Sequence, residues 1–162
     1  MTADFAQAFQ IQARGTWSGE AVDRVCLPYD DRFRRRLLVT CDSGRQVLIH
    51  LPDARVLRDG DALVTQAGLI AVAAAPERLA EVSCSNADQM VRIAWHLGNR
   101  HLPTQIRGTR LRIREDHVII EMVKRLGAGV TLLEAPFDPE GGAYGHGAVH
   151  GHEHSPGGQR HG

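Results

Sequence analysis

One stretch decides the fold of the second half of the chain: residues 110–127, which run RLRIREDHVIIEMVKRLG. Near its start, Leu111 and Ile113 alternate with three arginines, which is the pattern of a half-buried strand. Asp116 is a good N-cap for a following helix, and Gly127 is placed to stop that helix. The apolar positions of the helix have the spacing of one buried face: Val118, Ile119, Met122, Val123 and Leu126. The stretch therefore predicts a strand followed by a short amphipathic helix.

Similar elements extend outward on both sides of this stretch. Asn86, with Gln89 three residues later, forms a capping box for another helix, which Gly98 is placed to end. The predicted apolar face of that helix consists of Ala87, Met90, Val91, Ala94 and Trp95. Strands are predicted at residues 79–84, 104–107, 110–114 and 130–135. The resulting order, βαββαβ, is that of the ferredoxin-like split unit.

The first 75 residues have the pattern of a small all-β sandwich or barrel, with several short apolar runs at close spacing. Two of these runs, 36–41 and 45–51, are separated by Asp42-Ser43-Gly44, which is a hairpin signal. Ala74-Ala75-Pro76 marks the predicted boundary. The sequence thus predicts an α+β protein made of three parts: a small all-β domain at 1–75, a ferredoxin-like domain at 76–144 and a disordered His/Gly-rich tail at 145–162.

Composition excludes several classes of protein. The chain has 162 residues, in which 19 lysines and arginines balance 19 aspartates and glutamates. This balance argues against a general nucleic-acid or anionic-membrane binder, because such proteins have a basic excess. The longest strongly apolar stretch, 68–76, is far below the ~20 residues of a membrane span. Three cysteines without a chelating spacing, and a start without signal-peptide features, favour a cytoplasmic protein.

Arginines form two local clusters, at 32–36 and at 107–114. We interpret both as solvated strand faces, with a contact for a partner protein as the alternative. RNA binding by a ferredoxin-like sheet requires exposed aromatic residues on its strands, and residues 104–114 contain none.

Histidines are concentrated at the end of the chain, where five of the nine fall in the last seventeen residues. Imidazole is a common ligand of transition metals, and glycine neighbours let several imidazoles fold around one ion. On this basis the predicted tail ligands are His146, His150, His152 and His154. The alternatives are an engineered tag, although tags are usually unbroken histidine runs, and a merely polar tail.

A second candidate site lies in the stretch WHLGNRHLP, residues 95–103. His101 falls just past the predicted helix end, on a loop where a histidine is exposed and able to ligate a metal or take part in catalysis. His96 falls on the last helical turn, where it could bind a metal, pack, or cap the helix carbonyls. The spacing of the two histidines alone leaves these alternatives open.

Three separated motifs occur in order along the chain: HLGNRH at 96–101, Asp116-His117-Val118, and PFxPEGGAY at 136–144. Together they resemble the UreE family, urease accessory proteins that act as nickel metallochaperones. The similarity extends to TCDSGR at 40–45 and LRDGD at 57–61, and it covers about residues 9 to 145. It implies an N-terminal β domain, which we expect to contact partners, a C-terminal ferredoxin-like domain and a His-rich tail.

The resemblance implies that His101 is the principal metal ligand, and that two copies share one ion across a homodimer interface. His117 matches an auxiliary ligand of some members, whereas the histidine that some members have two residues earlier is Glu115 here. Ni(II) is the implied cargo. Zn(II) or Cu(II) would fit the same imidazoles, and affinity order alone favours copper, so the choice of nickel comes from the resemblance.

Further implications concern partners. The resemblance implies a chaperone, not an enzyme, that delivers nickel to apo-urease with an accessory GTPase and the urease activation complex. The alternative is a His-rich divalent metal buffer or storage protein not tied to urease. A metal-dependent hydrolase is a second alternative, but no carboxylate is positioned near a three-ligand cluster as a general base. No nucleic acid or membrane partner is expected.

Overall fold

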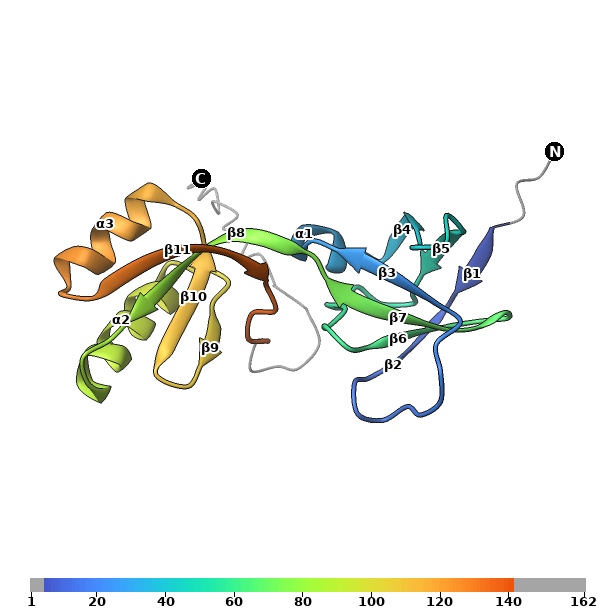
Figure 1. Ribbon diagram of the computed structural model, residues 1–162, viewed down its shortest axis with the longest axis horizontal. Coiled ribbons are helices and arrows are strands. Elements are labelled where there is room, and N and C mark those ends of the chain that lie inside the picture. The colour runs from blue at the N-terminus through green and yellow to red at the C-terminus, as the bar shows by residue number, and fades with distance from the viewer. Residues whose placement is uncertain (1–4, 142–162) are drawn as a thin grey trace, which may run out of the picture.

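The structure is a computed structural model that describes residues 5–141. Two lobes follow one another along the long axis of the molecule (Figure 1), the N-terminal lobe (residues 5–75) and the C-terminal lobe (residues 76–141). The fold is mixed α+β, mostly sheet with few helices. No helix of the described part is long and apolar enough to cross a membrane. The predicted tail at 145–162 lies outside the described residues.

The N-terminal lobe consists of two sheets and one single-turn helix. Its elements are β1 (Ala6–Ala8), β2 (Gln10–Gln12), β3 (Asp23–Leu27), α1 (Tyr29–Arg32), β4 (Arg36–Thr40), β5 (Gln46–His50), β6 (Ala62–Thr65) and β7 (Gly68–Ala74). The sheet orders are β1-β5-β4 and β2-β6-β7-β3. The predicted hairpin is confirmed: β4 and β5 are antiparallel, and Gly44 takes a φ of 88° in the turn. The all-β prediction misses α1.

An apolar core lies between the two sheets of the N-terminal lobe. Val39, Val47 and Ile49 from one sheet share a buried cluster with Val25 and Ile70 from the other. Alternate residues of a strand point to the same side, so these side chains face inward together. Each such burial stabilises the fold by about 1.5–3 kcal/mol. The lobe is therefore a small sandwich, as the short apolar runs predict.

The C-terminal lobe contains one antiparallel sheet and two helices. Its elements are β8 (Pro76–Ser83), α2 (Ala87–Asn99), β9 (Gln105–Arg107), β10 (Arg110–Arg114), α3 (His117–Arg125) and β11 (Gly129–Pro136), with sheet order β11-β8-β10-β9. Strand β8 leaves the N-terminal lobe and becomes a central strand here, where Val82 lies between Leu111 and Val130. The strand predicted at 110–114 is confirmed at both ends.

Both helices cover one face of this sheet. Their buried residues are Ile93 and Leu97 in α2 and Ile119, Ile120 and Val123 in α3, which share a core with the inward residues of the strands. The prediction that Val91, Trp95 and Val118 lie on buried faces is wrong, since these residues are 68%, 63% and 62% exposed. Each helix has more apolar residues than its buried stripe can hold, and the i, i+4 pair Ile93 and Leu97 sets the buried side of α2.

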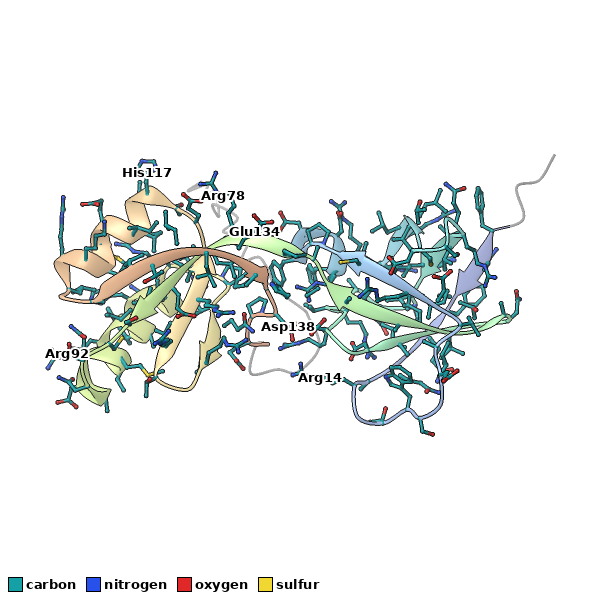
Figure 2. The ribbon with its side chains drawn as sticks, in the orientation of Figure 1. Arg14, Arg78, Arg92, His117, Glu134 and Asp138 are labelled. Atoms are coloured by element: carbon teal, nitrogen blue, oxygen red, sulfur yellow. The ribbon has the colours of Figure 1, made fainter. Side chains whose placement is uncertain are left out.

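The two lobes are joined by ion pairs around Asp138, which follows β11. Its carboxylate pairs with three arginines of the N-terminal lobe: Arg14 at 3.1 Å, Arg32 at 3.1 Å and Arg58 at 3.0 Å. We call these four residues the clasp. Figure 2 shows Asp138 between the lobes, with Arg14 reaching toward it from the N-terminal side. The side chain of Asp138 is only 9% exposed, so the clasp is an interior feature.

Arg32 is fully buried in the clasp. Besides Asp138, its guanidinium donates to the carbonyls of Leu27 (3.2 Å), Leu57 (3.0 Å) and Phe137. The prediction that this arginine belongs to a solvated strand face is therefore wrong. A buried guanidinium is tolerated here because its donors are used by a carboxylate and three carbonyl groups.

Further contacts at the lobe junction support the clasp. The buried carboxylate of Asp61 accepts hydrogen bonds from the backbone N–H groups of Arg14 (2.9 Å) and Arg58 (2.8 Å). The rings of Tyr29 and Phe137 meet edge to face, with centroids 5.7 Å apart. The LRDGD stretch at 57–61 and the beginning of the stretch at 136–144 thus meet at the lobe junction.

The second arginine cluster lies on the sheet face that the helices leave uncovered. Arg110 and Arg112 pair with Glu81 at 2.5 and 2.7 Å, and Arg114 pairs with Asp30 of the N-terminal lobe at 2.9 Å. Hydrogen bonds from Arg112 and Arg110 lower the pKa of the Glu81 carboxyl from its ordinary value. The interpretation as a solvated face holds for Arg110, which is exposed, but not for Arg112, whose side chain is 14% exposed.

Candidate metal centre

Helix α2 positions the first candidate ligands. The Asn86 side chain accepts a hydrogen bond from the N–H of Gln89 at 2.9 Å, and the Gln89 side chain accepts one from the N–H of Ser85 at 2.7 Å. The predicted cap is thus confirmed. The predicted stop is wrong, because Gly98 lies inside the helix, which continues to Asn99. The chain turns away only at residues 100–102.

His101 makes the turn at the end of α2. Its φ is 56°, and it is the one residue other than glycine with a positive φ among residues 5–141. Its side chain is exposed, and no hydrogen bond or ion pair to its imidazole is found within the described chain. A rigid backbone with an uncommitted imidazole is what a metal ligand requires before the ion arrives.

His96 lies on the last turn of α2 and is half-buried. Its ring meets the ring of Trp95 edge to face, with centroids 5.1 Å apart and an interplanar angle of 84°. This ring contact supports the alternative in which His96 packs against a neighbouring side chain. A role for His96 in metal binding stays a prediction.

His117 is the first residue of α3 and is exposed. The preceding residue, Asp116, caps the helix by accepting from the N–H groups of Val118 (2.9 Å) and Ile119 (3.2 Å), as predicted. Figure 2 shows His117 at the outer edge of the C-terminal lobe, well away from Asp138 and the clasp. Its imidazole is available to a ligand.

The two helices run antiparallel, so the end of α2 lies toward the start of α3. At one end, Gln89 donates to the carbonyl of Leu126 (3.2 Å); toward the other, Arg100 Nε donates to Met122 Sδ (3.0 Å). A shallow pocket of about 360 Å³ separates the loop after His101 from the start of α3. It is lined by Leu102, Pro103, Ile113, Arg114, Glu115, Asp116 and Ile119. Leu102, which follows His101, and Asp116, which precedes His117, both line this pocket.

No group of three or more histidine, cysteine, aspartate or glutamate side chains able to hold a metal ion occurs within residues 5–141. Burial raises the pKa of the Cys41 and Cys84 thiols, which disfavours the thiolate that a metal would need. The described part of one chain thus presents separate imidazoles instead of a closed coordination shell. The predicted ligands His146, His150, His152 and His154 lie outside the described residues.

Comparison with known proteins identifies the family. The model of the N-terminal domain of the UreE urease accessory protein matches residues 7–75, and the model of its C-terminal domain matches residues 77–162. The chain belongs to the UreE family. The resemblance seen in the three motifs is thereby confirmed.

Individual relatives agree with this assignment, and each is named urease accessory protein UreE. The protein of Rhodopseudomonas palustris strain BisB18 is 52% identical over 150 residues, which are 92% of this chain and 71% of that protein. The protein of Bradyrhizobium sp. strain ORS 278 is 54% identical over 139 residues, 85% of this chain and 66% of that protein. The protein of Ruegeria pomeroyi is 45% identical over 152 residues, 93% of this chain and 99% of that protein.

Within this UreE chain, Glu115 departs from the histidine of some family members. Its carboxylate pairs with Arg78, with Nε 2.8 Å from Oε2. This carboxylate is therefore already engaged by a guanidinium and would have to leave it in order to bind a metal. His117, at the start of α3, has no such ion pair within residues 5–141.

Sequence reasoning missed an exposed apolar surface on this UreE chain. Val91 and Trp95 lie one turn apart on α2 and are 68% and 63% exposed. The signal that could have found them is the pair Ile93 and Leu97, which sets the buried side of the helix elsewhere. This exposed apolar pair leaves apolar surface uncovered on α2, the helix that precedes His101.

Proposed function

We propose that this chain is a chaperone of urease maturation that binds Ni(II) as cargo and delivers it to apo-urease. The observation that carries the proposal is the exposed imidazole of His101, which has no partner within residues 5–141, at the end of α2 in a member of the UreE family. The names of its relatives support the link to urease. The chain acts as a carrier and not as an enzyme.

The proposed carrier is a homodimer in which two His101 side chains share one ion. Two findings support a second copy: residues 5–141 form no three-ligand cluster, and Val91 and Trp95 leave apolar surface uncovered on the helix that ends in His101. Two imidazoles fill only part of a nickel coordination shell. The remaining positions let the ion be handed on.

The other proposed ligands are auxiliary. His117 is exposed and follows Asp116, which lines the same pocket as Leu102, the residue after His101. His96 and the tail residues His146, His150, His152 and His154 complete the proposed set, and the tail collects the ion. Zn(II) and Cu(II) bind the same imidazoles, because the site type does not by itself select nickel.

The finer architecture and partners are also proposals. We propose a partner-binding domain at 1–75, a ferredoxin-like metal-binding domain at 76–144 and a His-rich tail at 145–162. The sheet order β11-β8-β10-β9 with two helices on one face supports the ferredoxin-like assignment. The accessory GTPase and the urease activation complex receive the loaded dimer. Three free cysteines support a reducing cytoplasmic setting.

Equilibrium dialysis of nickel against the full chain tests the central assignment. His101→Ala should abolish the tightest binding event, because it removes both shared ligands of the dimer. His50→Ala is the matched control, since His50 is also exposed but lies on β5 of the N-terminal lobe. If His101→Ala and His50→Ala bind the first nickel alike, the assigned site is wrong.

Two further arms separate the proposed carrier from a metal buffer. A chain that ends at Gly141 should bind fewer nickel ions per chain but keep the first site. The full chain should activate apo-urease in the presence of the accessory GTPase, and His101→Ala should fail to do so. Nickel binding with no effect on urease activation would instead identify a buffer.

A further inference from the structure

The two helices of the C-terminal lobe end in the same backbone motif but with different residues at its critical position. At the end of α3, Gly127 donates to the carbonyl of Lys124 (2.9 Å) and Ala128 to that of Val123 (3.2 Å). At the end of α2, His101 donates to Gly98 (3.0 Å) and Leu102 to Leu97 (3.2 Å). This pair of bonds defines a Schellman motif, whose turning residue is left-handed and usually glycine.

The turning residue is glycine in α3 but histidine in α2. Gly127 has a φ of 90°, and His101 has a φ of 56°. A side chain in the left-handed region brings its Cβ close to the backbone, so an L residue there lowers the stability of the fold relative to glycine. The His101 side chain is exposed and makes no hydrogen bond or ion pair within residues 5–141 that would offset this cost.

The residue after His101 is held on the inside of the lobe. Leu102 packs against the core of the C-terminal lobe, and its N–H is bonded to Leu97, which is fully buried. The backbone of His101 is therefore fixed on both sides, with its own N–H bonded to Gly98 and its neighbour held in the core. A ligand on such a backbone is oriented before the ion binds.

We propose that the Schellman motif at the end of α2 fixes the orientation of the His101 imidazole before metal binds, with Leu102 as the positioning residue. We call this backbone motif the mount. A histidine occupies the glycine position at a cost in stability because the imidazole is needed there. This inference rests on the proposed nickel site, and it adds that ligand orientation is set by the fold of one lobe before metal binding.

The first test measures stability without metal. In the full chain with chelator, the folded-to-unfolded ratio from urea denaturation should be about 5-fold higher for His101→Gly than for His101→Ala. Gly127→Ala should lower that ratio by at least a similar factor, since it places a side chain at a φ of 90° and its Cβ would lie 3.0 Å from Gln89 Nε2, and it should leave nickel binding unchanged. Equal ratios for His101→Gly and His101→Ala would overturn the claim of a cost.

The second test measures positioning. Leu102→Ala should weaken binding of the first nickel by about 10-fold or more and alter the absorption spectrum of the bound ion, as loss of groups that orient a ligand does. Leu102→Met should restore both, because it refills the core. Val123→Ala removes a fully buried side chain from the same core near the end of α3 and should leave affinity and spectrum unchanged.

The outcomes separate the mount from the proposed function. If Val123→Ala weakens nickel binding as much as Leu102→Ala does, Leu102 has only a structural role and the mount is wrong. If His101→Ala leaves the first nickel in place, the nickel site itself is wrong, whatever the stability order. Loss of nickel in His101→Gly together with a gain in stability is the result that supports both.

Discussion

The clasp and the end of α2 both contain polar side chains. Those of the clasp are paired with one another, whereas the one at the end of α2 has no partner within residues 5–141. In the clasp, Asp138 pairs with three arginines, and the fully buried Arg32 uses its donors on a carboxylate and three carbonyls. At the end of α2, His101 is exposed and its imidazole has no partner within residues 5–141. The charged groups of the clasp are paired with one another inside the fold, whereas the imidazole of His101 is left available.

This difference separates structural motifs from binding motifs among the stretches that link the chain to its family. The LRDGD stretch at 57–61 and the Phe137-Asp138 pair meet in the clasp, where they join the lobes. His101 and His117 are exposed and make no hydrogen bond or ion pair within residues 5–141, and their chain neighbours Leu102 and Asp116 line one pocket. A buried polar group with all partners satisfied stabilises the fold, whereas an exposed one without partners is available for binding.

The largest expected effect comes from breaking the clasp. Asp138→Ala removes the carboxylate shared by three arginines and leaves the buried Arg32 without its counter-ion. Loss of one partner of a buried pair costs about 3–5 kcal/mol. Urea denaturation should show this loss in the free energy of unfolding, while the first nickel still binds to the folded protein.

Asp53→Ala is the matched control for that experiment, because Asp53 is an exposed aspartate of the N-terminal lobe. Its effect should stay within about 0.5 kcal/mol. Similar stabilities for the two variants would show that the clasp does not hold the lobes together. Loss of nickel binding in folded Asp138→Ala would show that the two regions are coupled after all.

Local signals in the sequence predict much of the C-terminal lobe. The caps at Asn86 and Asp116, the stop at Gly127 and the strand at 110–114 are all found, because each depends on neighbouring residues alone. On α2, Met90 and Ala94 pack against the core as predicted, but Val91 and Trp95 do not, since an apolar residue such as Trp95 fits a core or an exposed contact surface equally well by pattern. Packing against the sheet decides between them.

The clasp could not be predicted, because its partners come from distant parts of the sequence. Arg32 lies in a basic run that resembles a solvated face, and its partner Asp138 is 106 residues away. At the candidate site, the sequence and the family resemblance indicate His101 and His117. They do not reveal the left-handed backbone of His101, because histidine is an unusual residue for that conformation.

A smaller effect is expected from the exposed apolar surface of α2, which we propose for the dimer interface. Trp95→Ser should raise the dimer dissociation constant by about 30-fold, since a tryptophan at the centre of an interface typically contributes about 2 kcal/mol or more. Sedimentation over a dilution series measures this constant. Leu38→Ser is the control, because Leu38 is an exposed apolar residue of the N-terminal lobe. An unchanged dimer in Trp95→Ser would place the interface elsewhere.

The smallest effect is expected at Glu81. Its carboxylate is buried, as in the clasp, but one of its partners, Arg110, is exposed. Its pKa is lowered by hydrogen bonds from Arg112 and Arg110, so the folded state favours the charged form. This contribution is fully present above the ordinary glutamate pKa of about 4.3 and is lost as pH falls through the lower folded value.

Glu81→Gln should therefore cost under about 1 kcal/mol at pH 7, because solvent screens the exposed arginine. The difference in unfolding free energy between wild type and Glu81→Gln should shrink as the pH is lowered below about 4.3. A difference that stays constant over that range would mean that the charge of Glu81 contributes nothing and that its packing alone matters.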